Sequence, residues 1–382
     1  RNHDFGDTQR NRVSRLSPWM RHRLLLEDDL LAAVLNAHDA RQADAFVQEV
    51  FWRGYFRGHL EHRPAIWKRY CAERDKAFVD LAGRSARRAA YDTAVTGTTR
   101  LECYDTWVQE LTESGYLHNH ARMWFASIWL FTLKLPWQLG ADFFLQHLID
   151  GDPASNTCSW RWVAGLHTVG KTYLATADNI TKYTGGRFNK VQGLAQLAVA
   201  QTEPELPTPQ PPVFESAESI PTDCRLGLLV VESDCQPDSL PLPQPPQAVL
   251  TLTDPCNRSI QPLSARASEF TRAALTSAAD TAANAFAVPV HCDASGDWHN
   301  ALRTWAAEHT LDALAVARPP VGWVQDRLAP ALHALEREGI RVIRITRQHD
   351  RAVWPHAAKG YFKLKKQIPT LLRTLGLDGN TR

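Results

Sequence analysis

Residues 150–162 read Asp-Gly-Asp-Pro-Ala-Ser-Asn-Thr-Cys-Ser-Trp-Arg-Trp, and residues 118–124 read His-Asn-His-Ala-Arg-Met-Trp. Together these two stretches place two carboxylates, two arginines, two amides and several indoles in one helical region. Such a mixture of charged, hydrogen-bonding and aromatic side chains suits a large, flat, redox-active cofactor.

The chain around these stretches, residues 1–202, is expected to form a helical domain. Glu27–Ala37 has acids first and apolar residues at helical spacing, and few strand-like alternations occur in this half. The other expected helices are Ala43–Gly58, Tyr104–Leu111, Arg122–Leu133 and Ala141–Ile149.

Residues 203–223 are expected to form a linker, because they carry five acids, no base and prolines that favour extended chain. In residues 224–382 short apolar runs alternate with helical stretches, which predicts a smaller, Rossmann-like α/β domain with a parallel sheet. The expected strands are Leu226–Val231, Ala248–Leu252, Ala287–Val290, Leu311–Ala317 and Ile340–Ile345. The expected helices are Ser268–Asn284, Asp297–His309, Val324–Glu338 and Gly360–Leu375.

Composition narrows the function classes. A length of 382 residues suggests two domains, and seven cysteines without a Cys-x-x-Cys pair argue for a reducing compartment and against a zinc ribbon or an iron–sulfur site. No run of 18 apolar residues and no signal-peptide pattern occurs, so we expect a cytoplasmic monomer that does not contact a membrane. The strip 341–373 holds nine bases and one acid; it can meet phosphates or form a solvated helix face.

Several motifs in the first half, taken in order, resemble the FAD-binding domain of the DNA photolyase/cryptochrome family. The resemblance covers roughly residues 10–190. The motifs are Ser-Arg-Leu-Ser at 14–17, Phe-Val-Gln-Glu-Val-Phe-Trp-Arg at 46–53, Gly97 with Thr99 and Asp105, Ser-Gly-Tyr-Leu-His-Asn-His-Ala-Arg-Met at 114–123, and the stretch from Asp150 to Asn156.

The resemblance implies FAD as the cofactor. Ser14, Leu16 and Ser17 would grip its pyrophosphate. The Arg122 guanidinium would pair with a carboxylate beside the flavin, and the amide of Asn156 would face flavin N5, where cryptochromes commonly carry Asp or Cys. The cofactor-binding residues implied in this way are Arg12, Ser14, Leu16, Ser17, Phe46, Glu49, Arg53, Asn119, Arg122, Asp150, Asp152 and Asn156.

The resemblance also implies light-driven chemistry on DNA that carries UV lesions. The implied lesion pocket consists of Glu49, Trp52, Asn119, Met123 and Trp162. Trp160 and Trp137 match the first two members of a tryptophan electron-transfer chain. The third member has no counterpart; Tyr91, Trp107, Trp124 and Trp129 are candidates to replace it.

The chain also departs from the family. Phe46 replaces a Trp and Arg100 a Gly, and the α/β domain follows the helical domain instead of preceding it. That order indicates either a circular permutation or an unrelated α/β domain, and we therefore expect no antenna chromophore. We expect no metal, since His118 and His120 point to different faces of a helix.

Three functions remain open from the sequence. The first is repair of UV-induced pyrimidine dimers by electron transfer from excited reduced flavin. The second is a cryptochrome-like blue-light photoreceptor without repair. The third is a structural flavoprotein or a binder of single-stranded nucleic acid.

Overall fold

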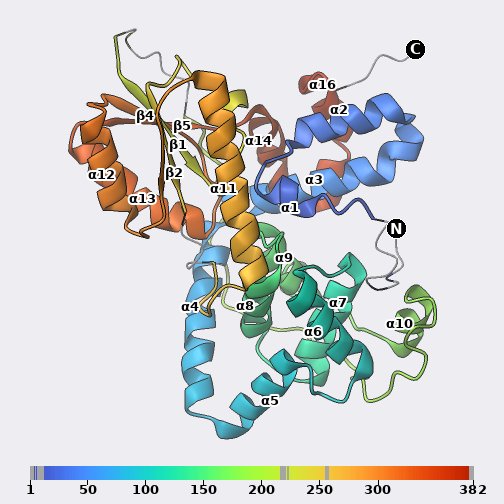
Figure 1. Cartoon of the computed structure of the whole chain (residues 1–382). Coiled ribbons are helices and arrows are strands. Elements are labelled where there is room, and N and C mark those ends of the chain that lie inside the picture. The colour runs from blue at the N-terminus through green and yellow to red at the C-terminus, as the bar shows by residue number, and fades with distance from the viewer. Residues whose placement is uncertain are drawn as a thin grey trace. The chain divides into compact units, whose positions relative to one another are not determined.

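The computed structural model is mostly helical and contains a five-stranded parallel sheet in its C-terminal part, which confirms the expected fold class (Figure 1). The structure describes residues 4, 6, 13–215, 221, 223–253 and 258–377. Among the described helices, none is both long and apolar enough to cross a membrane.

The chain divides into two compact units whose boundaries differ from those expected. The first unit comprises residues 1–18, 65–207 and 258–268, and the second comprises residues 19–64, 208–257 and 269–382. Residues 19–64 thus belong with the sheet-containing unit, whereas the short segment 258–268 belongs with the helical one.

Helix ends in the first unit follow local chemistry. The Asp152 side chain caps α9 and Pro153 occupies its first position, where no backbone N–H is needed. Gly97 and Gly115 end α5 and α6 with left-handed φ angles of 64° and 67°. The helices of this unit are α4 (Pro64–Ala82), α5 (Ser85–Thr96), α6 (Glu102–Ser114), α7 (Asn119–Ser127), α8 (Trp137–His147), α9 (Pro153–Val163) and α10 (Ala177–Tyr183).

One helix of the first unit departs from expectation. The sequence predicted one helix over Arg122–Leu133, but the α-helix starts earlier and gives way to a π-helical turn at Ile128–Thr132. The wider turn carries Trp129 into the core, where its indole Nε1 donates to Pro136 O at 2.8 Å. A single π turn of this kind is a recognised way to re-aim side chains near functional sites.

The second unit is built on the strand order β3-β2-β1-β4-β5, all parallel. Its strands are β1 (Leu226–Val231), β2 (Ala248–Leu252), β3 (Val290–Asp293), β4 (Ala313–Ala317) and β5 (Arg341–Ile345). Its helices are α1 (Ser17–Arg21), α2 (Glu27–Ala37), α3 (Ala40–His62), α11 (Ala265–Phe286), α12 (Trp298–Glu308), α13 (Trp323–Arg337), α14 (Gln348–Val353), α15 (Tyr361–Lys365) and α16 (Ile368–Thr374).

Side-chain alternation along β1 explains why helices cover both faces of the sheet. Leu226, Leu228 and Val230 are buried together with small residues of α11. A Cβ on Gly227, which points the other way, would collide with the indole of Trp305 in α12. The central strands are therefore buried on both sides, as expected for a parallel sheet.

Two of the departures from the expected elements in this unit have a local cause. Strand β3 begins at Val290 rather than Ala287, because Ala287 has a φ of 53° and its N–H still bonds to Ala283 O at the end of α11. The helix expected over 360–375 is divided into α15 and α16 because Pro369 has no N–H to continue it.

Strand order reverses between β1 and β4, the place where open α/β sheets usually bind ligands. Here polar groups after β1 bond to the chain's own residues 21–23. The Arg21 guanidinium binds the carboxylate and carbonyl of Glu232 and lies over the Trp323 ring. Arg23 lies 3.5 Å from Asp234, which accepts two hydrogen bonds from Arg347 at 2.6 and 2.7 Å.

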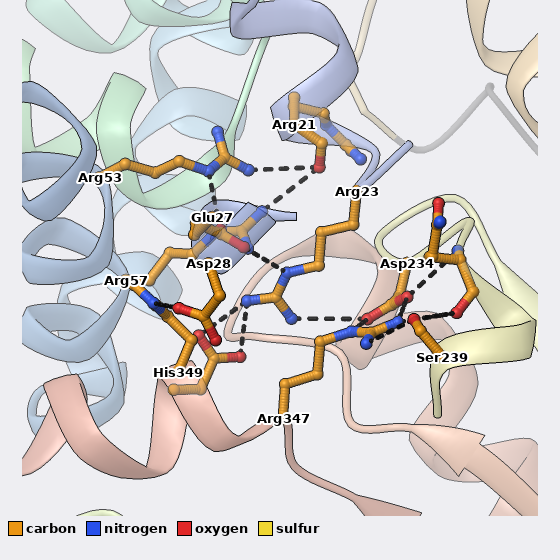
Figure 2. A network of polar contacts seen from close by, with 12 residues as sticks. Arg21, Arg23, Glu27, Asp28, Arg53, Arg57, Asp234, Ser239, Arg347 and His349 are labelled. Carbon is orange, nitrogen blue, oxygen red and sulfur yellow. Dashed lines mark hydrogen bonds and ion pairs between the residues drawn. The ribbon is translucent and has the colours of Figure 1, made fainter. Parts of the chain in front are cut away.

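Figure 2 shows the centre of this buried network. Arg23 donates to both carboxylate oxygens of Asp350 at 2.7 and 2.8 Å and to Glu27 at 3.3 Å. Glu27 also lies 3.5 Å from Arg53 of α3. The network thus links α2, α3 and α14 within the second unit.

Glycines let α3 approach the C-terminal segment closely. Added Cβ atoms on Gly54 and Gly58 would lie 3.0 Å from Val353 and 2.9 Å from the Cα of Trp354. Together with the ion pairs, this contact fixes the helix that carries Glu49 and Trp52.

Candidate functional site

A tight turn brings the two stretches of the helical unit together. Gly115 ends α6, and its carbonyl accepts a hydrogen bond from Ile149 N at 2.9 Å. A Cβ on Gly115 would lie 2.6 Å from the Ile149 side chain, so only glycine permits this approach. The start of α7 therefore lies beside the segment that precedes α9.

An ion pair follows from this approach. Arg122 Nη2 donates to Asp150 Oδ2 at 2.9 Å, while Arg122 Nε donates to Leu117 O at 2.9 Å. Burial opposes both charges, but mutual attraction outweighs it: the pKa of Arg122 is raised and the pKa of Asp150 is lowered. The nearby Ser17 hydroxyl also favours the ionised form of Asp150 and so contributes to its lower pKa. Asp150 is therefore a buried carboxylate held in its charged form.

A second arginine, missed by the sequence reading, lies under the same loop. Arg258 is buried, and its guanidinium donates to the carbonyl of Leu148. The guanidinium packs against Gly151 so closely that a Cβ there would collide with it. Its positive charge lowers the pKa of Asp150 further and, after burial itself, contributes to lowering the pKa of His147 to about 4.

The segment that carries Arg258 is anchored to α8. Ser259 Oγ donates to Asp142 Oδ2 at 2.7 Å, and Ile260 N donates to Asp142 Oδ1 at 3.3 Å. Burial raises the pKa of Asp142 to about 6 despite these bonds. Arg258 lies far along the chain from residues 118–162 in a stretch without a motif, so no local sequence signal could have identified it.

Asp152 and Asn156 have defined local partners. Asp152 Oδ1 accepts a hydrogen bond from Ser155 N at 2.9 Å, so at least one of its oxygens caps α9. Asn156 Nδ2 donates to Ala141 O at 2.9 Å, which orients the buried carboxamide. The sequence reading did not anticipate the capping role of Asp152.

The α3 residues implied in the lesion pocket lie in the second unit. The Trp52 indole stacks on Tyr361, with ring centroids 3.5 Å apart and planes 12° apart, and Tyr361 donates to Gln48 O at 2.9 Å. Arg53 donates to Arg21 O at 3.3 Å in addition to its pairing with Glu27 (Figure 2). Glu49 is exposed and Phe46 is half-buried.

Aromatic rings form a connected core in the first unit. The Trp160 ring lies edge-on to Trp129 at 6.2 Å, and Trp129 lies edge-on to Tyr91 at 6.0 Å. A Cβ on Gly140 would collide with Trp160, so glycine permits this packing. Trp137 instead stacks on Tyr70 at 5.5 Å.

The remaining implied residues differ in exposure. Arg12 lies outside the described residues. Ser14 and Asn119 are exposed, and Leu16 and Met123 are half-buried. Trp162 is 36% exposed and stacks on Tyr173 at 5.5 Å.

Two further pairs of motif residues make structural contacts. Thr99 donates to Asp105 through both its N–H, at 3.0 Å, and its hydroxyl, at 2.6 Å, which closes the turn after α5. His118 Nδ1 accepts from His120 N at 3.2 Å, and the His120 ring stacks on Trp124 and Tyr183.

Comparison with known proteins identifies a domain type that part of the chain resembles. Residues 46–185 match the family described as the FAD binding domain of DNA photolyase. This segment is therefore similar to the FAD binding domains of the photolyase/cryptochrome family. The matching domain points to FAD as the cofactor.

Relatives carry both names of the family. The deoxyribodipyrimidine photo-lyase of Streptomyces griseus is 34% identical over 162 residues, which cover 41% of this chain and 33% of that enzyme. The enzyme of the same name from Escherichia coli is 29% identical over 169 residues (44% and 33%), and cryptochrome DASH of Idiomarina loihiensis is 28% identical over 163 residues (40% and 34%). The chain thus spans about one third of the length of these curated relatives. No solved structure matches the chain significantly.

The polar groups of the first unit are of the kinds that can hold such a flavin. Asp150 Oδ1 is buried and has no hydrogen-bond partner among the described residues, so an additional donor can be accommodated there. Arg122 and Asn156 supply one cation and one amide on adjoining helices. A buried acceptor without a partner costs about 1–3 kcal/mol, which a bound donor would recover.

Proposed function

We propose that this protein is an FAD-dependent lyase that splits UV-induced pyrimidine dimers in DNA under blue light. The observation that carries the proposal is the Arg122–Asp150 ion pair together with the oriented carboxamide of Asn156, both within a segment that matches the FAD binding domain. Reduced FAD, when bound, would supply the light-excited electron donor for the splitting of the dimer.

The protein's own residues would hold and tune this cofactor. Arg122 would provide a fixed positive charge at the flavin edge, and Asp150 Oδ1 would accept a hydrogen bond from it. Asn156 would meet the flavin with a neutral amide, which does not oppose the added electron as a carboxylate would. Ser14, Leu16 and Ser17 would contact the phosphates, and Asp152 the ribityl or imide side.

The proposed lesion pocket rests on the family resemblance, from which each of its residues is assigned. Trp52 and Trp162 would pack on the flipped-out bases, Met123 would lie against them, and Glu49 and Asn119 would hydrogen-bond them. Extrusion of a base costs least at a damaged site, which would make binding selective for lesions. Basic side chains would bind the DNA backbone, so affinity should fall as salt rises.

For reduction of the cofactor we propose a route through Trp160. The ring centroids of Trp160 and Trp129 lie 6.2 Å apart, and those of Trp129 and Tyr91 lie 6.0 Å apart. These edge contacts support electron transfer onward through Trp129 to Tyr91, in place of the missing third tryptophan. Trp137, stacked on Tyr70, would provide a second branch.

The decisive experiment is repair of a thymine-dimer oligonucleotide by purified, chemically reduced protein under blue light and in the dark. External reduction bypasses the aromatic route, so the result reports on repair alone. Light-dependent loss of the dimer is the expected outcome. A flavin spectrum without dimer loss would contradict the proposal for this lesion, and absence of a flavin spectrum would contradict the assigned cofactor site.

One observation favours the photoreceptor as a second candidate. Tyr361 covers one face of the Trp52 indole, and Trp52 is the residue assigned to pack on the lesion. If the ring stays covered when damaged DNA is added, the flavin would serve as a light sensor only. Light-dependent flavin reduction without dimer loss, in both the wild type and Tyr361→Ala, is the result that would favour this candidate.

A further inference from the structure

We propose that His291, Glu308 and His309 in the second unit form a binding site for a divalent metal ion. The types of these three ligands favour Zn²⁺. The Nε2 atoms of the two histidines lie 2.8 Å apart. One ligand atom from each of the three residues lies within 4.8 Å of the others. This site is independent of the proposed flavin chemistry.

The fold explains why these side chains meet. Trp305 of α12 packs against the sheet at Gly227, which fixes the position of the helix. His309 follows one turn later, and its N–H bonds to Trp305 O at 3.1 Å, so its ring projects from the same face. His291 lies on the edge strand β3, opposite Leu250 of β2, and faces His309 with ring centroids 4.8 Å apart.

The distances require only a small adjustment to hold an ion. Tetrahedral zinc with bonds of about 2.0–2.1 Å to nitrogen places its ligand atoms about 3.3 Å apart. The two imidazoles must therefore separate by about half an ångström, and the carboxylate of Glu308 must move inward. Both movements are feasible, because Glu308 is exposed and both histidines are only half-buried.

The ligand types select the ion. Two imidazoles and one carboxylate suit Zn²⁺, Co²⁺ and Ni²⁺ better than Mg²⁺ or Ca²⁺, which prefer oxygen ligands. His309 also caps the C-terminus of α12, where the helix dipole favours a positive charge. Three protein ligands leave a fourth position for water.

The test is titration of the chelator-treated full-length protein with Zn²⁺ in competition with a chromophoric chelator. We expect the double variant His291→Gln/His309→Gln to lose one bound Zn²⁺ per chain. We expect His309→Gln alone to weaken the binding of that ion by more than about 10-fold, since even the loss of a residue that only orients a metal ligand costs about this much. The control His299→Gln removes an exposed histidine from the same helix and should bind as the wild type does.

Two outcomes would overturn the proposal. If the double variant binds Zn²⁺ with the stoichiometry and affinity of the wild type, the two histidines form only a hydrogen bond. If Cys292→Ser removes the ion, the exposed neighbouring thiol is a ligand and the set named here is wrong. Circular dichroism of each variant separates loss of the ion from loss of the fold.

Discussion

Replacement of Arg23 by Met tests whether the buried network in Figure 2 holds the second unit together. Arg23 and its partners Glu27, Asp234 and Asp350 all have side-chain exposures of 3% or less. After the change, Glu27 retains Arg53 and Arg57, and Asp234 retains Arg347. Asp350 loses its partner of closest geometry, at 2.7 Å.

The expected loss in the free energy of unfolding follows from the buried charge that Asp350 retains. Removal of one partner from a buried ion pair costs about 3–5 kcal/mol, since the other charge stays buried without compensation. The double variant Arg23→Met/Asp350→Asn removes that charge as well. It should therefore be about 1–3 kcal/mol more stable than Arg23→Met alone.

The assay is urea unfolding followed by circular dichroism and tryptophan fluorescence. The control Arg225→Met breaks an exposed pair with Asp312 in the same unit and should leave the midpoint nearly unchanged, because water screens that pair. The reasoning fails if Arg23→Met unfolds at the wild-type midpoint. It also fails if the double variant is less stable than Arg23→Met alone.

Four further changes have defined outcomes. Gly151→Ala should displace the Arg258 guanidinium, cost about 1–3 kcal/mol and reduce bound flavin; an unaltered urea midpoint and flavin absorbance would contradict this. Asn156→Asp should lower the flavin midpoint potential in spectroelectrochemistry and slow repair, and unchanged values would refute the assignment to N5. Trp160→Phe should slow photoreduction, whereas a wild-type rate would exclude it as the first donor. Burial lowers the pKa of His349, but nearby carboxylates raise it overall. The contribution of His349 to stability is therefore complete below about pH 6.5 and is lost as pH rises through its folded-state pKa. In His349→Gln the urea midpoint should depend less on pH over that range.

Local signals mark only some of the element ends around the site. Asp152 and Pro153 mark the start of α9 and Gly115 marks the end of α6, whereas the start of α7 and its change to a π-helical turn were not predicted. The Arg122–Asp150 pair could be expected because family-like motifs put both residues in one region. The bond of Asn156 to Ala141 O could not, since it depends on how α8 and α9 pack.

Local sequence patterns predict the helical character of the first half, the alternation of strand and helix in the second, and the residues that resemble a flavin site. Periodicity and capping act locally, so they can be read along the chain. Only the tertiary structure decided that Arg258 lies under the Asp150 loop, that residues 19–64 belong to the sheet-containing unit, and that His291 meets His309. These contacts join residues far apart in sequence, and packing alone brings them together.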